Sequence, residues 1–274
     1  MMKSVSFWSF PGELSVAERM DMAKAVGFEG IELTLEGEGE ITMDTTAADM
    51  AQYKDMAADK GLQLLTFASG LAWETPALSP DPAVAEQGVA IVRKCLELGA
   101  ALGVGTILCV PGSVTDDYAY DRAYEDLIST FKTLGPEARD AGVVIGLENV
   151  WNKFLLSPVE FARALDEIDE EFVGSYFDVG NCVINGYPDQ WIRILGSRIS
   201  AVHFKDFRVV GWAGTIDNFC DLLEGSVPWD RVMAAFAEIG YDGACTAEMM
   251  PPYAHFPERL LEATSRSMDA ILSM

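Results

Sequence analysis

The sequence is poor in positive charge, in histidine and in paired cysteines. Lys and Arg number 19 against 43 Asp and Glu, so the formal net charge at pH 7 is −24. Phosphate backbones are bound by clustered Lys and Arg, and we therefore expect neither a nucleic acid nor an anionic membrane as partner. The five cysteines are odd in number and include no Cys-x-x-Cys pair, which argues against a disulfide framework.

Other absences concern targeting and nucleotide binding. No apolar segment is long enough to span a bilayer, and the N-terminus runs into a strand-like segment without a signal-like apolar stretch. Together with the unpaired cysteines this predicts a cytoplasmic protein. The chain has no Gly-x-x-x-x-Gly-Lys-Ser/Thr motif and no Gly-x-Gly-x-x-Gly after its first predicted strand. These motifs are the main sequence evidence for a nucleotide-binding fold, so their absence argues against such a fold.

The most informative stretch is the apolar run at residues 143–148, which follows Gly142 and ends in Glu148. A short run rich in β-branched residues after a helical segment predicts a parallel strand that is covered on both faces. Parallel α/β folds bind their ligands at the carboxyl ends of the strands. Glu148 is therefore a candidate for chemistry.

Strand-like and helix-like segments alternate along the whole chain. Strands are expected at residues 5–10, 30–35, 62–67, 106–110, 143–148, 173–177, 199–204 and 243–247. Helices are expected at residues 15–27, 45–60, 83–102, 118–141 with an interruption near Gly135-Pro136, 158–168, 188–195, 228–239 and 257–272. Eight alternations without adjacent strands require parallel pairing through helical crossovers. The chain of 274 residues also matches the size of such a barrel, and we predict a single (β/α)8 TIM barrel domain over residues 1–274.

Each of the last four predicted strands ends in a residue that can bind a metal ion. These residues are Glu148, Asp178, His203 and Glu248. Neighbouring strand ends lie close together in a barrel, so the four side chains can converge on one ion. Three carboxylates and an imidazole suit a hard or borderline divalent cation, with Mn²⁺ preferred and Mg²⁺, Co²⁺ or Zn²⁺ as alternatives. Glu32, in the second predicted strand, is interpreted as a solvated or loop-capping acid.

The sequence around these ligands resembles a known family. Leu147-Glu148-Asn149, Phe177-Asp178-Val179-Gly180-Asn181, His203-Phe204-Lys205-Asp206 and Thr246-Ala247-Glu248 are similar to motifs of the xylose isomerase-like TIM barrel superfamily, in its sugar-phosphate isomerase/epimerase branch. The resemblance implies a divalent metal held by Glu148, Asp178, His203 and Glu248, with Glu148 and Glu248 also acting as catalytic acid and base. It implies a ketose or ketose-phosphate isomerase or epimerase of carbohydrate metabolism, which transfers a proton through a metal-stabilised enediolate. It also implies a homo-dimer or homo-tetramer.

Five further residues are expected to bind the substrate: Trp8, Lys153, Asn181, Lys205 and Arg208. The three cations among them follow strand ends and would suit an anionic sugar such as a phosphate. The alternative is that Lys205 pairs with an acid of the site. Trp8, Phe67 and Trp151 could form an apolar wall. Asn181 lies where some ketose 3-epimerases have a histidine, which argues against 3-epimerisation of a free ketose.

Other functions remain open at this point. An inosose-type dehydratase and a hydroxypyruvate-type isomerase could use the same metal site. A non-catalytic sugar-binding barrel is also compatible with the motifs, although binding alone needs no pair of glutamates. The trinuclear zinc endonucleases of the superfamily need more histidines than the two that the chain contains.

Overall fold

The structure, a computed structural model, describes residues 1–211, 214–250, 253 and 255–274. Over these residues eight parallel strands close into a barrel in the order β1-β10-β7-β6-β5-β4-β3-β2. The strands are β1 (Met2–Ser6), β2 (Gly30–Leu35), β3 (Thr66–Ser69), β4 (Thr106–Cys109), β5 (Val144–Glu148), β6 (Val173–Asp178), β7 (Ile199–Phe204) and β10 (Ala244–Ala247). The predicted TIM barrel fold is confirmed.

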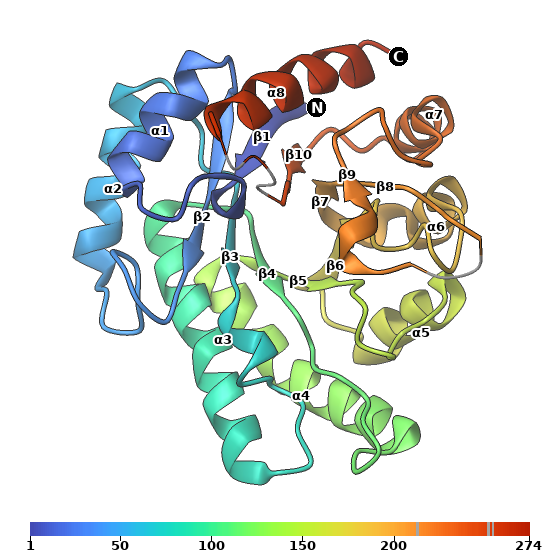
Figure 1. Cartoon of the computed structure of the whole chain (residues 1–274). Coiled ribbons are helices and arrows are strands. Elements are labelled where there is room, and N and C mark those ends of the chain that lie inside the picture. Colours follow the sequence, from blue (N-terminus) through green and yellow to red (C-terminus); the bar gives the residue numbers. More distant parts are fainter. Residues whose placement is uncertain (212–213, 251–252, 254) are drawn as a thin grey trace.

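In the described part of the chain eight α-helices surround this ring of strands (Figure 1). They are α1 (Val16–Ala25), α2 (Ala47–Asp59), α3 (Pro82–Leu102), α4 (Tyr120–Ala141), α5 (Pro158–Ile168), α6 (Pro188–Leu195), α7 (Trp229–Ile239) and α8 (Glu258–Leu272). Local signals explain several ends: Ser15 caps α1 through a capping box with Glu18, and Gly103 ends α3 in the left-handed conformation. None of the described helices has both the length and the apolar character that crossing a bilayer requires.

The first and last parts of the chain close the barrel together. Strand β1 pairs with β10, with Val5 opposite Ala247. The Lys3 ammonium of β1 donates to Ser265 Oγ at 3.2 Å and to Asp269 Oδ1 at 2.5 Å, both in α8. The two chain ends accordingly lie near each other in Figure 1.

Two apolar clusters fill the part of the molecule that the structure describes. The larger one lies between the strands and the helices and includes Phe177 and Phe204. The smaller one consists of Ala68, Leu108, Val110, Tyr176 and Ala201. Side chains alternate between the two faces of a strand, so Tyr176 points away from its neighbour Phe177 and into the barrel.

A two-stranded antiparallel sheet, β8 (Asp206–Phe207) with β9 (Phe219–Cys220), follows β7 and was not predicted. Short 3-10 helices also occupy the loops: η1 (Phe7–Ser9), η2 (Leu71–Trp73), η3 (Gly196–Arg198) and η4 (Ile216–Asn218). In Figure 1 the β8–β9 hairpin stands in front of the ring of strands. It forms part of the rim around the carboxyl ends of the strands.

Candidate metal centre and substrate cavity

Four neighbouring strands bring the predicted metal ligands together. Glu148 and Asp178 are the last residues of β5 and β6, His203 is the penultimate residue of β7, and Glu248 directly follows β10. Asp178 lies opposite His203 in the β6–β7 register, so these two ligands stand at one height. One ligand atom from each of the four residues lies within 4.8 Å of the others.

The cluster contains buried oxygen and nitrogen atoms whose lone pairs are free to bind a cation. Asp178 Oδ2 and His203 Nδ1 are buried without a hydrogen-bond partner. His203 Nδ1 lies 2.9 Å from Glu248 Oε2 and 3.5 Å from Glu148 Oε1, close but not in hydrogen-bonding geometry. Buried polar atoms are normally satisfied, and carboxylate oxygens with one imidazole nitrogen match the ligands of a divalent cation. The residues present therefore fit a divalent metal ion.

Glu32 of β2 contacts the other side of the His203 ring. Its Oε1 lies 2.9 Å from His203 Nε2, and its Oε2 accepts a hydrogen bond from the Tyr176 hydroxyl. When Nε2–H donates to Glu32, the neutral imidazole presents a bare Nδ1 to the cluster. The interpretation of Glu32 as a solvated acid is wrong, because the residue is completely buried inside the barrel.

Lys205 supplies the positive charge of the cluster. Its Nζ lies 2.7 Å from Glu248 Oε2 and 3.3 Å from Asp178 Oδ2. Burial acts to lower the pKa of Lys205, but the carboxylates of Asp178 and Glu248 outweigh it and raise this pKa well above the usual value. The alternative prediction, that Lys205 pairs with a site acid, is the one that these distances support.

The two glutamates titrate differently. Burial raises the pKa of Glu148 to about 7. Burial acts in the same direction on Glu248, but Lys205 and His203 outweigh it and lower the pKa of Glu248 to about 2. Carboxyl groups whose environments separate their pKa values in this way are typical of acid–base pairs.

Two asparagines hold the ligands in place. Asn149 donates through Nδ2 to the Asp178 carbonyl at 2.9 Å and accepts from the Asp178 N–H at 2.8 Å. The backbone N–H of Asn181 donates to Asp178 Oδ1 at 2.7 Å, and its side chain donates to the Asn149 carbonyl at 3.0 Å. These contacts join the ends of β5 and β6, from which Glu148 and Asp178 project.

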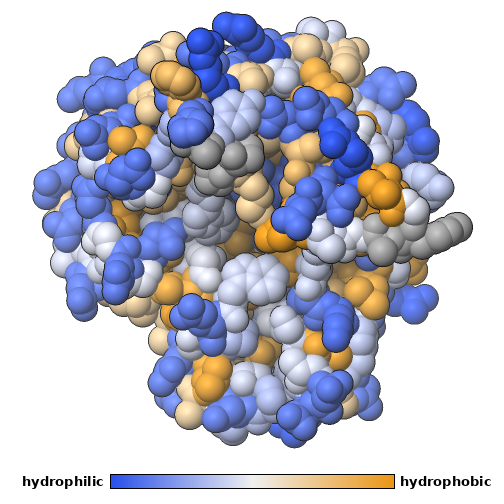
Figure 2. All heavy atoms as spheres, viewed as in Figure 1, coloured by the Kyte–Doolittle hydropathy of each residue, from blue (hydrophilic) through white to orange (hydrophobic). Residues whose placement is uncertain are grey.

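A cavity of about 250 Å³ opens onto the cluster. Its polar side is formed by Glu148, Glu248 and Lys205, with Asn181 and Ser69. The rest of its described lining is apolar and comes from Trp8, Trp73, Leu108, Val110, Val150, Trp151, Ile216, Phe219 and Met250. Figure 2 shows hydrophilic atoms along the rim of this face and paler or orange atoms around the hollow at its centre.

The residues predicted to bind substrate do not all reach the cavity. Trp8, Asn181 and Lys205 line it, whereas Lys153 and Arg208 do not belong to its described lining. Arg208 lies 3.4 Å from Glu224 on the surface, and Lys153 is exposed. Their role in binding stays a prediction that the geometry does not support.

The aromatic wall was predicted in part. Trp8 and Trp151 line the cavity, while Phe67 is buried in the core. Trp73, Ile216 and Phe219 also line it but were not predicted. They belong to η2, η4 and β9, short elements of the loops, where no strand-end pattern marks a residue as part of the site.

Comparison with known proteins identifies the family. Residues 20–271 match the family described as "Xylose isomerase-like TIM barrel". The chain belongs to this family. The resemblance inferred from the sequence is thereby confirmed.

Several curated relatives of this xylose isomerase-like chain are sugar epimerases by name. A putative L-ribulose-5-phosphate 3-epimerase of Haemophilus influenzae is 23% identical over 251 residues, which cover 88% of this chain and 86% of that protein. A D-psicose 3-epimerase of Enterocloster bolteae is 24% identical over 257 residues, which cover 89% of this chain and 79% of that protein.

Other relatives are matched over a shorter part of their length. The chain spans 56% of an uncharacterised protein of Methanocaldococcus jannaschii and 60% of a 3-oxo-isoapionate decarboxylase of Pectobacterium atrosepticum, at 26% identity to each. The relatives thus carry more than one kind of named activity.

Solved structures show the same fold. The IOLI protein with a bound zinc atom superposes with a TM-score of 0.84 at 16% identity, over 100% of this chain and 98% of that one. A D-psicose 3-epimerase determined in the presence of D-fructose superposes with a TM-score of 0.79 at 17% identity, over 100% of both chains.

Proposed function

We propose that this protein is a divalent-metal-dependent enzyme that isomerises or epimerises a keto-sugar by moving a proton on the carbon beside its carbonyl. Glu148, Asp178, His203 and Glu248 form a cluster of potential metal ligands, which we call the metal-type cluster. The observation that carries the proposal is that two glutamates of this cluster, Glu148 and Glu248, both line the cavity. A site that only binds a sugar needs no second acid–base group. The epimerase names among the relatives support a carbohydrate as the substrate.

The chain's own groups are arranged for proton transfer. Glu148, Asp178, His203 and Glu248 would hold the ion, with Mn²⁺ preferred, and when bound it would polarise the carbonyl and stabilise negative charge on its oxygen. Strands β5 and β10 are separated by β6 and β7 in the barrel order, so Glu148 and Glu248 approach a sugar from different sides. One glutamate removes the proton and the other returns one, in an order that the configuration of the sugar decides.

Proton exchange in D₂O tests the proposal. The Mn²⁺-loaded protein is incubated with a panel of ketoses, ketose phosphates and keto-glycosides, and NMR follows loss of the proton beside the carbonyl. We expect exchange with at least one compound, and at least a ~10²-fold loss of rate in Glu148→Gln and in Glu248→Gln, since each would remove one positioned acid–base group. The matched control is Glu224→Gln, because Glu224 is an exposed glutamate that pairs with Arg208 outside the cavity lining and its change leaves exchange intact.

Absence of exchange across the panel, with Mn²⁺ stoichiometrically bound, would overturn the isomerase proposal. Exchange followed by loss of water would instead identify the dehydratase, which begins with the same proton removal. The dimeric or tetrameric state and the cytoplasmic location stay predictions.

A further inference from the structure

The cavity offers few free polar groups away from the metal-type cluster. Ser69 Oγ donates to the Leu35 carbonyl at 3.1 Å and accepts from the Leu71 N–H at 3.2 Å. The indole N–H of Trp8 donates to Glu36 at 2.8 Å, and the indole N–H of Trp151 donates to the Asn181 carbonyl at 2.9 Å. These lining groups are already bonded to protein, so they are poor partners for hydroxyls of a ligand.

An unsubstituted sugar suits such a wall badly. A free ketose has a hydroxyl on almost every carbon beyond its carbonyl. Each hydroxyl placed against the apolar wall would lose hydrogen bonds to water and would gain none from the protein. A ligand with a polar reacting end and an apolar far end would satisfy both parts of the cavity.

The charges around the cavity disfavour binding of a phosphorylated sugar. Lys205 is the only cation in the described lining of the cavity, and it already pairs with Asp178 and Glu248. The five residues outside the described part of the chain are Trp212, Ala213, Pro251, Pro252 and Ala254, none of which carries a charge. A phosphate dianion would therefore face the carboxylates of the cluster without a free counter-charge.

The apolar wall is open and partly rigid. Trp151 stacks on Phe219 with ring centroids 5.2 Å apart and an interplanar angle of 22°, and packs edge-on against Phe207 at 5.3 Å. Trp73 and Ile216 are 54% and 60% exposed although both line the cavity. Large exposed apolar side chains grouped around one hollow are typical of a binding surface for an apolar group, and Figure 2 shows this hollow at the centre of the face.

We infer that the substrate is an uncharged keto-sugar whose far end carries an apolar substituent, as in a small glycoside with an aromatic aglycone. The inference rests on the proposed function, since it places the sugar carbonyl at the metal-type cluster. The aglycone packs against Trp73, Trp151 and Ile216. The anionic sugar expected from the sequence is the alternative that the test has to exclude.

Matched glycoside pairs test the inference by binding alone. Phenyl and methyl β-glycosides of glucose, galactose and xylose in their 3-keto forms, together with glucose 6-phosphate and fructose 6-phosphate, are titrated calorimetrically into the Mn²⁺-loaded protein. For at least one sugar we expect the phenyl glycoside to bind at least ~10-fold more tightly than the methyl glycoside, because the ring buries additional apolar surface.

Two cavity variants and one control locate the effect. Trp73→Ala and Ile216→Ser alter side chains that are more than half exposed, and each should reduce the phenyl preference at least ~3-fold. Tyr187→Ala removes a side chain that is also 60% exposed but outside the lining of this cavity, and the preference should be unchanged. Equal affinities within all three pairs, tighter binding of a sugar phosphate, or a preference untouched by both cavity variants would each overturn the inference.

The result is independent of the reaction, because no turnover is measured. A protein that exchanges the proton of a free ketose but shows no phenyl preference keeps the proposed function and loses this inference. A protein that prefers phenyl glycosides but exchanges no proton retains the apolar subsite and loses the proposed reaction.

Discussion

Glu32 contacts the metal-type cluster through His203. The carboxylate lies between the His203 imidazole and the Tyr176 hydroxyl, and all three side chains are completely buried. In metal sites a carboxylate that accepts from the second ring nitrogen fixes the tautomer and orientation of the histidine. With an ion bound, Glu32 would therefore position His203 and would not itself be a ligand.

Replacement of Glu32 by Gln should weaken metal binding. The amide oxygen can still accept from His203 and the amide N–H can donate to the Tyr176 hydroxyl, but the neutral amide lacks the negative charge that fixes the tautomer and raises the basicity of the imidazole. We expect the Kd for Mn²⁺, measured by calorimetry or electron paramagnetic resonance, to rise ~10–100-fold. The control is Glu38→Gln, which changes an exposed glutamate in the loop after β2.

A second variant separates positioning from general damage to the core. Tyr176→Phe keeps the ring and removes only the hydrogen bond to Glu32, so it should weaken Mn²⁺ binding by less than Glu32→Gln. Unchanged Mn²⁺ affinity in Glu32→Gln, with a folded protein, would show that the Glu32–His203 contact does not tune the site.

The potential metal ligands could be predicted from the sequence, but the residue that contacts His203 from behind, Glu32, could not. Glu148, Asp178 and Glu248 could be predicted because each ends a recognisable apolar strand, which is a local pattern. Glu32 lies inside a strand, and its partner His203 is 171 positions away. Only the closure of the barrel brings these two residues together, so the carboxylate could not be assigned to His203 from the pattern of β2 alone.

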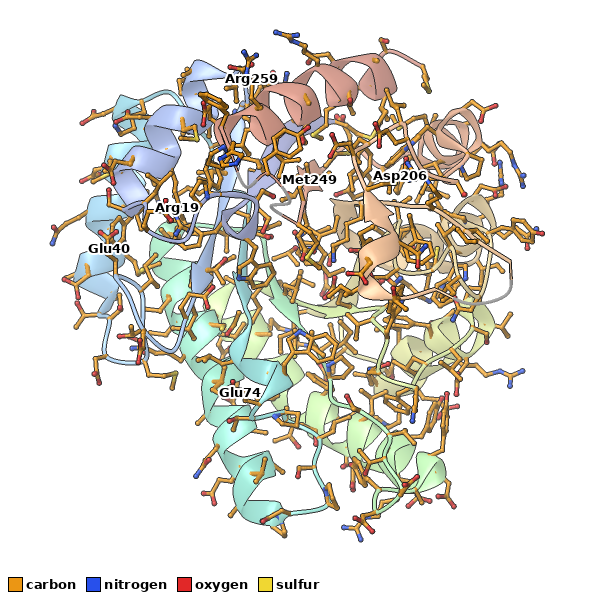
Figure 3. All side chains as sticks on the ribbon, in the orientation of Figure 1. Arg19, Glu40, Glu74, Asp206, Met249 and Arg259 are labelled. Atoms are coloured by element: carbon orange, nitrogen blue, oxygen red, sulfur yellow. The ribbon has the colours of Figure 1, made fainter. Side chains whose placement is uncertain are left out.

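At the scale of elements, the β8–β9 hairpin depends on one buried carboxylate, which is labelled in Figure 3. Asp206 Oδ1 accepts from the N–H groups of Phe207 and Val227, and Oδ2 accepts from the Leu223 N–H and the Trp229 indole. Asp206 thus joins the hairpin to the loop before α7. The hairpin in turn carries Phe219, part of the cavity wall.

Asp206→Asn should loosen this hairpin. Asn has a single acceptor oxygen, so two of the four donors would face an amide NH₂ and remain unsatisfied. We expect a loss of about 2–3 kcal/mol in the free energy of unfolding, measured with urea. Asp217→Asn, an exposed change in η4 of the same loop, should alter it by less than ~0.5 kcal/mol. Equal effects of the two changes would contradict the role assigned to Asp206.

Elements with periodic patterns and clear end signals were predictable, and the irregular ones were not. The predicted bounds of β2, α5, α6 and β7 agree with the structure. The predicted break near Pro136 is wrong, since α4 continues through it and buries Phe131, Leu134 and Ala138 on one face. Tertiary packing outweighs the hydrogen bond that proline removes. The β8–β9 hairpin escaped prediction because each of its strands has only two residues, too few to show an alternation.

At the scale of the whole molecule, negative charge is the dominant feature. A net charge of −24 at pH 7 is spread over a chain that has only 19 Lys and Arg. Several of these cations form exposed pairs, such as Arg93 with Glu137 and Arg198 with Asp166. Exposed pairs contribute little stability individually, so most of the remaining acids repel one another across the surface. This repulsion disfavours the compact state.

Salt should therefore stabilise the protein at neutral pH. Raising NaCl from 0.01 M to 0.1 M shortens the screening length from ~30 Å to ~10 Å and so weakens repulsion between distant acids. A gain of about 1 kcal/mol would raise Tm by ~2–4 °C in a protein of this size, measured by differential scanning calorimetry. At pH 4.2, near the sequence pI of about 4.2, the net charge is close to zero and the same salt step should leave Tm nearly unchanged. An equal rise in Tm at both pH values would assign the effect to chloride or sodium binding and not to relief of charge repulsion.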